Sequence, residues 1–348
     1  MAHSDMVHTH VSGMAHVGMP GGSKRKIMII IQMSGGLGNQ MFQYALYLKL
    51  KSLGHEVKFD DRTEYDRPNV RSIQLSAFGI RYPEATKDDI NRLTDGSMNM
   101  KDRVRRCFTG RKTTEYRENG TNYDEGVFEH DPSYLVGNFQ SERYFADITD
   151  KVRKSFVFDQ SIITEEIHEW EEQITHEDAI SIHVRRGDYL DAADVYGGIC
   201  TDAYYDAAIR YMQHKYPDAV FYLFTNDPEW SKLFIDQHSY AKINAVKCSE
   251  EYTGYLDMYL MTKCRHHIIA NSSFSWWGAW LGKDVDERST SSEHDADRTD
   301  NEYECCHRNV IAPRIWLNNG KCADIHTDDM ILIDSAGKVD DTSHTCCE

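Results

Sequence analysis

From residue 27 onward, short apolar runs alternate with amphipathic segments, and this alternation constrains the fold more than any other feature of the sequence. KIMIIIQ (26–32) has the length and composition of a strand, NQMFQYALYLKLKSLG (39–54) has the apolar spacing of a helix, and HEVKFDD (55–61) resembles a second strand. Strands that alternate with helices are typical of parallel α/β layers. The sequence therefore predicts an α/β chain that begins with a βαβ unit.

The second half of the chain repeats the same order with clearer boundaries. Thr201 precedes a helical segment as a candidate N-cap, and Pro217 follows the end of that segment. The repeated order predicts a doubly wound domain built with right-handed crossovers. The alternating strands and helices that we expect are AISIHV, TDAYYDAAIRYMQHKY, AVFYLF, EWSKLFIDQH, INAVKC, TGYLDMYLMTKC, HHIIAN and SSFSWWGAWLG.

The 348 residues are enough for two domains of ordinary size with a cleft between them. Residues 61–130 lack a clean period, and we expect helices and loops that flank the cleft there, with DDINRLTDG as a short helix. The expected divisions are a disordered leader (1–26), an N-terminal domain (27–160), a C-terminal domain (161–335) with an acidic inserted loop (284–304), and a tail (336–348).

Composition excludes several classes of function. A net charge of −17 and a pI near 5.4 argue against a sequence-independent hold on nucleic acid or on an anionic membrane. For contacts with anions, local basic segments such as VRRCFTGRK (104–112) are therefore more informative than the net charge of the chain. No apolar run approaches the ~20 residues that span a bilayer, and the nine cysteines show no regular framework. We expect a cytoplasmic protein with reduced thiols and no stable membrane insertion, with peripheral attachment at the inner membrane face as an alternative.

The segment IIIQMSGGLGNQMFQYA (29–45) combines a strand, a glycine-rich bend and a helix N-terminus. Backbone N–H groups and the helix dipole make such a junction an anion site. Gly36 and Gly38 match the first half of the dinucleotide pattern G-x-G-x-x-G, and Asp60 or Asp61 lies about 20 residues further on, where a ribose-binding acid would stand. An NAD-dependent oxidoreductase that uses this loop is therefore the alternative function.

Three residues of the same loop depart from the dinucleotide pattern. Met41 occupies the third glycine position, and Asn39 and Gln40 stand where a dinucleotide needs small side chains. The partial fingerprint alone is thus a weak signal.

Three expected strands of the second half end in polar clusters, namely HVRRGDY, TNDPEW and NSSFSWW. Ligands bind outside the carboxyl ends of strands in open α/β sheets, so these clusters should converge on one site. Arg185 and Arg186 lie side by side at a strand exit, and guanidinium groups suit phosphate oxygens. The alternative is that they are surface arginines paired with Asp188 or Asp191.

The other two clusters add polar groups to this edge. Ser272 and Ser273 stand where a strand gives way to a helix, so their hydroxyls and the first-turn N–H groups could face an anion, or could merely cap the helix. Asn226 and Asp227 could bind the edge of a nucleobase, or could open a turn at Pro228. Together the clusters predict a nucleoside diphosphate held by arginine and a helix N-terminus.

The motifs SGGLGNQMFQYA, NFQSERYF, HVRRGDY, FTNDPEW and NSSFSWWGAW occur here in the order and approximate spacing of a known family. Over roughly residues 27–335 the chain resembles the bacterial-type α-1,2-fucosyltransferases of glycosyltransferase family 11. The conjunction of HVRRGDY with NSSFSWWGAW is highly specific, whereas GGLGNQ alone would not be.

The resemblance implies a GT-B-like α/β fold with two Rossmann-type domains that face each other across a cleft. It implies that GDP-β-L-fucose binds mainly to the C-terminal domain, with the acceptor on the N-terminal side. The implied reaction is inverting transfer of L-fucose to the 2-OH of a terminal β-galactoside in a surface glycan. The implied partners are GDP-fucose and a galactose-terminated oligosaccharide, with no nucleic acid and no cofactor besides the donor substrate.

The resemblance also assigns roles to residues by their position in the motifs. In the shared pattern H-x-R-x-x-D, Arg185 contacts the donor diphosphate and Asp188 is an orienting acid; we take these two as the catalytic pair. Asp188 would be a poor general base, because two adjacent cations depress the pKa of a carboxyl. The implied donor-binding residues are His183, Arg186, Asn226, Asp227, Ser272, Ser273, Ser275, Gly36, Gly38, Asn39 and Gln40.

Two further features carry alternatives. DVD (284–286) and DAD (295–297) spell the D-x-D pattern of metal-dependent transferases, but they lie in the acidic insert and not at a strand end, so we expect no metal site. Trp276, Trp277 and Trp280 could stack on sugar faces, but their helical spacing after a cap favours core packing.

Overall fold

The computed structural model describes residues 28–68, 72–120, 122–130, 132–186, 192–247, 254–282, 308–318, 320 and 323–340. Several predictions fall outside these ranges: the leader (1–26), the acidic insert with both D-x-D patterns, most of the tail, and Asp188 with its neighbour Asp191.

The N-terminal sheet has four parallel strands in the order β2-β1-β4-β3. Four of the five residues of β1 are buried, as expected for a central parallel strand covered on both faces. The βαβ unit predicted from residues 26–61 is confirmed, whereas β3 lies in the segment where we expected only helices and loops. The strands are β1 (Met28–Gln32), β2 (Glu56–Asp60), β3 (Glu115–Arg117) and β4 (Ser133–Val136).

The C-terminal sheet has six parallel strands in the order β10-β9-β8-β5-β6-β7. Numbered from β5 as the first strand, this is the order 3-2-1-4-5-6 of the Rossmann fold. The predicted doubly wound domain is confirmed. The strands are β5 (Ala179–Val184), β6 (Val220–Thr225), β7 (Ile243–Ala245), β8 (His266–Ile268), β9 (Val310–Pro313) and β10 (Met330–Ile333).

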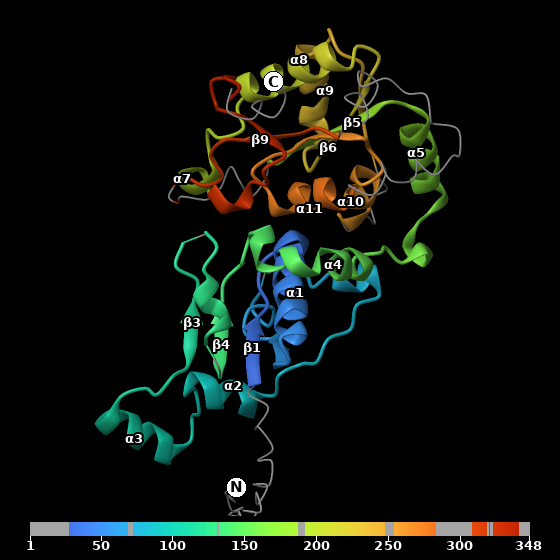
Figure 1. Cartoon of the computed structure of the whole chain (residues 1–348). Coiled ribbons are helices and arrows are strands. Elements are labelled where there is room, and N and C mark those ends of the chain that lie inside the picture. Colours follow the sequence, from blue (N-terminus) through green and yellow to red (C-terminus); the bar gives the residue numbers. More distant parts are fainter. Residues whose placement is uncertain are drawn as a thin grey trace, which may run out of the picture.

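Helices surround both sheets, and the two sheets belong to separate layers of the molecule (Figure 1). The chain is therefore α/β with two Rossmann-type halves, as expected for a GT-B-like fold. The α-helices are α1 (Leu37–Ser52), α2 (Lys87–Thr94), α3 (Met100–Thr109), α4 (Thr149–Ser155), α5 (Glu165–His176), α7 (Ala193–Tyr196), α8 (Asp202–Lys215), α9 (Pro228–Gln237), α10 (Tyr255–Met261) and α11 (Ser273–Leu281).

The two halves meet where α1 of the N-terminal half approaches α11 of the C-terminal half (Figure 1). All three tryptophans of α11 are buried in one core that continues into α1, so the core interpretation is confirmed and stacking on an exposed sugar is excluded. Trp277 packs with its ring centroid 4.9 Å from that of Phe42 on α1, and its indole N–H donates to the carbonyl oxygen of Gly38 at 3.0 Å. The seam between the halves is therefore an apolar core with specific hydrogen bonds.

Part of the prediction for residues 61–130 is wrong. Helix α2 forms where DDINRLTDG predicted it, and Thr86 and Asp89 close its N-terminus as a capping box. However, α2 and α3 lie at the end of the N-terminal half that is remote from the C-terminal half (Figure 1). The reason is that Leu93 of α2 packs with Met28 at the start of β1, opposite the strand ends that face the seam.

No helix in the described part of the chain is long and apolar enough to span a membrane. The same residues contain no group of three or more His, Cys, Asp or Glu side chains placed to hold a metal ion.

Candidate functional site

Each sheet has one position where its strand order reverses, and both positions lie beside the seam. In the C-terminal sheet this switch point lies between β5 and β8, which are paired neighbours, and in the N-terminal sheet it lies between β1 and β4. The crevice outside the carboxyl ends of the strands at a switch point is the usual binding site of doubly wound folds. The polar clusters predicted at strand ends are therefore brought to the expected edge.

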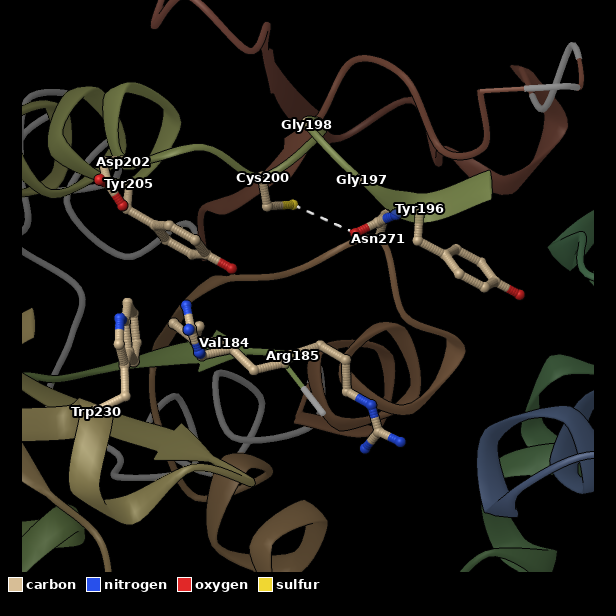
Figure 2. Close-up of a pocket in the computed structure, with 11 residues that line it drawn as sticks. Val184, Arg185, Tyr196, Gly197, Gly198, Cys200, Asp202, Tyr205, Trp230 and Asn271 are labelled. Carbon is tan, nitrogen blue, oxygen red and sulfur yellow. Dashed lines mark hydrogen bonds between the residues drawn. The ribbon is translucent and has the colours of Figure 1, made fainter. Parts of the chain in front are cut away.

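A pocket of about 120 Å³ opens at the C-terminal switch point, next to the end of β5 (Figure 2). This volume is below the ~300–1,000 Å³ of sites that enclose a whole small molecule, so the pocket suits only part of a nucleotide sugar. Figure 2 shows Arg185 extending away from Trp230 and Tyr205. The pocket is lined by Val184, Arg185, Arg186, Tyr196, Gly197, Gly198, Cys200, Asp202, Tyr205, Trp230 and Asn271.

Arg186 is held on the β6 side of the pocket. Its Nε donates to the Asp227 carboxylate at 3.1 Å, its guanidinium lies 4.6 Å from the centre of the Trp230 ring, and its backbone N–H donates to Asn226 Oδ1 at 2.9 Å. Asp227 also accepts from the Trp230 N–H and so caps α9, which confirms the turn at Pro228. Asn226 and Asp227 thus orient Arg186 in this structure.

His183 is the next-to-last residue of strand β5 and is almost completely buried. Burial, and next the charge of Arg185, lower the pKa of this imidazole to about 3. The ring lies 5.5 Å from that of Phe274 on α11, and its Nδ1 has no hydrogen-bond partner in the described structure. His183 is therefore a neutral ring beside the N-terminus of α11, with an unused polar atom.

The N-terminus of α11 lies at the same edge, because β8 runs directly into it. Ser272 is the N-cap residue, yet its hydroxyl makes no capping hydrogen bond. The Ser273 hydroxyl donates to Asn39 Oδ1 across the seam at 2.7 Å. By contrast, the Ser275 hydroxyl is buried and bonds the carbonyl oxygens of Ala270 and Ser272, at 3.4 and 3.2 Å. Ser272 is therefore a buried N-cap residue with a free capping position and Ser273 is partly exposed at the seam, whereas Ser275 braces the first helical turn.

The glycine loop before α1 meets α11 end to end. Gly36 is the N-cap residue of α1, and Gly35, which we had not singled out, has a φ of 75° that favours glycine. A Cβ on Gly38 would stand 2.5 Å from the backbone nitrogen of Phe274 and 2.6 Å from the Ser273 hydroxyl. Gly38 is thus a point of close backbone approach between the halves, and the N-termini of two helices lie next to each other there.

Asn39 connects the two switch points. Its Oδ1 accepts from Gln140 at 2.8 Å and from Ser273 at 2.7 Å, while its Nδ2 donates to Asn138 Oδ1 at 3.2 Å. Asn138 and Gln140 belong to the NFQSERYF motif, which follows β4. The motif GGLGNQ, the motif NFQSERYF and the serine-capped helix therefore form one hydrogen-bond network.

Gln40 and Asp60 are used inside the N-terminal half. The Gln40 amide donates to the carbonyl oxygens of Gly35 and Ser72 and accepts from the Gln74 N–H. These hydrogen bonds tie the glycine loop to the segment around residues 72–74. Asp60 is fully buried, and its carboxylate accepts from the hydroxyls of Tyr134 and Thr63 and from two backbone N–H groups.

These four donors leave the Asp60 carboxylate unavailable to a ribose. Its neighbour Asp61 interacts with Tyr82 and Arg62 at the strand exit. The dinucleotide interpretation of the loop is wrong for Asp60, because this acid is part of the core, and the oxidoreductase alternative is not supported.

The model of the family described as glycosyl transferase family 11 matches residues 107–298, which is more than half of the chain. The chain belongs to glycosyl transferase family 11. This glycosyltransferase is 30% identical over 267 residues to an alpha-1,2-colitosyltransferase from Escherichia coli, covering 73% of this chain and 87% of that protein. It is 25% identical to the human galactoside alpha-(1,2)-fucosyltransferase 1, covering 71% of this chain and 64% of the human protein.

Among solved structures, the glycosyltransferase is similar to the crystal structure of NodZ alpha-1,6-fucosyltransferase soaked with GDP-fucose. The TM-score is 0.41 at 16% identity, covering 74% of this chain and 93% of that one. A structure of POFUT1 in complex with GDP-fucose gives a TM-score of 0.43 at 10% identity, covering 74% and 94%.

The glycosyltransferase also has pocket residues that the sequence interpretation missed. Cys200 comes from the segment that leads into α8, Tyr205 from the first turns of α8 itself, and Asn271 precedes the serine pair. Burial raises the pKa of the Cys200 thiol to about 12, and this thiol donates to Asn271 Oδ1 at 3.5 Å. Asn271 and Trp230 could have been found as members of the motifs NSSFSWW and TNDPEW, whereas Cys200 had no local signal.

Proposed function

We propose that this family 11 enzyme transfers L-fucose from GDP-β-L-fucose to the 2-OH of a terminal β-galactoside, with inversion to an α-1,2 link. Family membership and the names of the relatives from Escherichia coli and human support an α-1,2 transfer of a deoxy sugar. The oxidoreductase alternative leaves the arginine pair and the serine-capped helix without a role.

The observation that carries the proposal is the convergence of positive potential at the seam. Arg185 leaves the end of β5, next to the N-terminus of α11, and the N-terminus of α1 abuts that of α11 at Gly38. Guanidinium groups and helix N-termini both stabilise phosphate oxygens. Such an arrangement is suited to a leaving group that gains negative charge, as GDP does in glycosyl transfer.

In the proposed reaction, the acceptor 2-OH attacks the anomeric carbon of fucose as the bond to the GDP oxygen breaks, and the hydroxyl proton is lost to solvent as the new bond forms. The transition state carries positive charge on the sugar and increasing negative charge on the departing phosphate. Arg185 and the N–H groups after Ser272 stabilise that phosphate, and removal of one such donor typically costs ~10²-fold or more in rate. This source of positive charge requires no divalent cation, so we propose metal-independent transfer.

We propose the remaining donor contacts from the positions of the side chains. Arg186, oriented by Asp227 and Trp230, supplies the second cation for the diphosphate. Neutral His183 contacts the donor through a ring nitrogen without adding charge. Asn226 lies beside Arg186 at the guanine end.

On the N-terminal side, Gly36, Gly38 and Asn39 border the donor at the seam, while Gln40 and Ser275 act through the backbone that they brace. Asp188 stays a prediction, as an acid that orients the arginines. We propose a cytoplasmic location and a galactose-terminated glycan of the cell surface as the product.

The test is release of GDP from GDP-fucose with lactose as acceptor, in EDTA, for the intact protein, Arg185→Ala and Arg210→Ala. Arg210 is a matched control because it is exposed on α8 and pairs with Asp206 and Tyr240. We expect turnover that survives EDTA, a loss of ~10²-fold or more in Arg185→Ala, and a rate within about twofold for the control.

The donor is tested in a second arm with GDP-colitose, since one relative is named for colitose. Turnover with GDP-colitose and none with GDP-fucose would show that the donor sugar is colitose, while the proposed location of the donor site would stand. Absence of binding and turnover with either donor and any β-galactoside would refute the proposal.

A further inference from the structure

Helix α3 presents an unusually exposed apolar surface at the end of the N-terminal half that is remote from the seam (Figure 1). Phe108 is 85% exposed, Met98 77%, Met100 71% and Val104 50%, and the first three are the most exposed large apolar side chains in the described part of the chain. Helix α3 itself has no buried residue. Most large apolar side chains in the described part of the chain are buried, so an exposed cluster of this size indicates a surface that binds a partner.

Hydrogen bonds from one face of α3 fix the rotation of this helix relative to the rest of the N-terminal half, so the apolar side chains on its other face point to the solvent. Arg105 pairs with the Asp95 carboxylate, and Arg106 donates to the carbonyl oxygens of Asp95 and Ser97 at 2.9 and 2.5 Å. Asp95 ends α2 in the left-handed conformation and also accepts from the Lys112 N–H at 2.9 Å. This anchor turns the opposite face of α3 away from the protein.

On that outward face, Met100, Val104 and Phe108 follow one another at intervals of four residues and form a continuous stripe. Lys101 and Arg103 lie on its two flanks, at about 100° per residue. An apolar stripe between basic flanks is the pattern of a helix that lies in the plane of a membrane surface.

The charge of this segment contrasts with that of the whole chain. Residues 98–112 contain six lysines or arginines and one aspartate, which gives +5, whereas the chain as a whole carries −17. Such a segment is attracted to anionic lipid headgroups while the rest of the protein is repelled. It would also repel a second copy of itself, which argues against self-association through this face.

We propose that α3 docks this protein on an anionic membrane surface. The stripe of Met100, Val104 and Phe108 enters the boundary between headgroups and acyl chains, and Lys101, Arg103 and Arg111 contact lipid phosphates. Because α3 lies at the far end of the N-terminal half, the docked protein keeps its seam exposed (Figure 1). The attachment is peripheral and depends on salt.

The test is flotation of the full-length chain with vesicles of phosphatidylcholine, with and without about one-third phosphatidylglycerol. We expect flotation only with the anionic vesicles, and its loss at high salt. Val104→Ser combined with Phe108→Ser should reduce the partition coefficient by at least about tenfold. Lys101→Ser combined with Arg103→Ser should reduce it by about fivefold for each charge removed.

The matched control is Val157→Ser combined with Leu233→Ser, which removes two apolar side chains of similar exposure, 63% and 60%, from other surfaces. Its flotation should equal that of the unaltered chain, and far-ultraviolet circular dichroism should be the same for all variants.

Four results would overturn the proposal, and the first three concern flotation itself. They are absence of flotation, equal flotation with neutral vesicles, and a Val104→Ser/Phe108→Ser variant that floats like the unaltered chain. Concentration-dependent self-association that is abolished by the same variant, without flotation, would assign the face to a second copy and would also overturn it.

Discussion

Gly38→Ala tests whether the close contact between α1 and α11 holds the donor site together. The new Cβ would stand 2.5 Å from the backbone nitrogen of Phe274 and from the backbone carbon of Ser273. These are backbone atoms at the start of a helix with a buried core beneath it, so they cannot move aside as a flexible side chain can. Restoring an ordinary contact of 3.4 Å requires a displacement of ~0.9 Å between the two helix N-termini.

Such a displacement has a cost that can be worked from the contacts at the seam. The Ser273 to Asn39 hydrogen bond would lengthen from 2.7 Å to ~3.6 Å, outside hydrogen-bonding range. The bond from the Trp277 indole to the Gly38 carbonyl oxygen, 3.0 Å long, would be strained as well. Overpacking costs ~1–3 kcal/mol and each weakened hydrogen bond ~1 kcal/mol, whereas alanine gains up to ~1 kcal/mol over glycine in a helix. We expect a net loss of about 2–4 kcal/mol in the free energy of unfolding.

The assay is urea unfolding followed by tryptophan fluorescence, since Trp276, Trp277 and Trp280 all lie in the seam core, together with the KM for the donor. Gly278→Ala is the matched control: it is also a glycine within a helix, but its Cβ meets the flexible Met261 side chain at 3.0–3.3 Å. The control should lose less than about 1 kcal/mol. If Gly38→Ala is as stable as Gly278→Ala and keeps the donor KM, the helix contact does not organise the site and the reasoning is refuted.

Three further changes have defined outcomes. His183→Gln removes a group whose pKa is about 3 in the folded chain against 6.5 in the unfolded chain; its contribution to stability is therefore complete above pH 6.5 and is lost as the pH falls from 6.5 toward 3. The free energy of unfolding of the variant should fall less steeply with decreasing pH than that of the unaltered chain, by up to ~1.4 kcal/mol per pH unit. Urea unfolding at pH 6.5 and at pH 5 measures this; an equal loss of free energy between the two pH values in both proteins would contradict the prediction. Asp227→Asn keeps the cap of α9 but loses the ion pair with Arg186, and both side chains of that pair are about one-third exposed. We expect a stability change below ~1 kcal/mol with a several-fold higher KM for GDP-fucose. An unchanged KM would show that Arg186 does not contact the donor. Glu118→Ala deletes the carboxylate that accepts from the N–H of Phe139, a residue held at φ 53°. We expect a loss of ~1–3 kcal/mol in the free energy of unfolding and a raised donor KM. Thermal unfolding at the temperature of the unaltered chain would show that the backbone at Phe139 does not depend on Glu118.

The sequence by itself determined the class of fold and the edge of the sheet at which the candidate site lies. Local apolar runs such as MIIIQ of β1 and AISIHV of β5 specify buried parallel strands, because both faces of such strands are covered. The polar residues that follow β5, β6 and β8 had to meet at one edge, because parallel strands share the direction of their carboxyl ends. The tryptophans of α11 were also predictable as core from their spacing alone.

Only the tertiary structure decided which polar side chains face the crevice and which brace it. Asp60 and Gln40 have the sequence context of ligand contacts, yet both are saturated by partners within the N-terminal half that come from other segments. Gly38 matched a phosphate-loop pattern, but it is needed because a helix distant by more than 230 residues packs against it. Residue spacing records the local conformation, whereas hydrogen-bond saturation and backbone contact depend on segments that meet only in the folded chain.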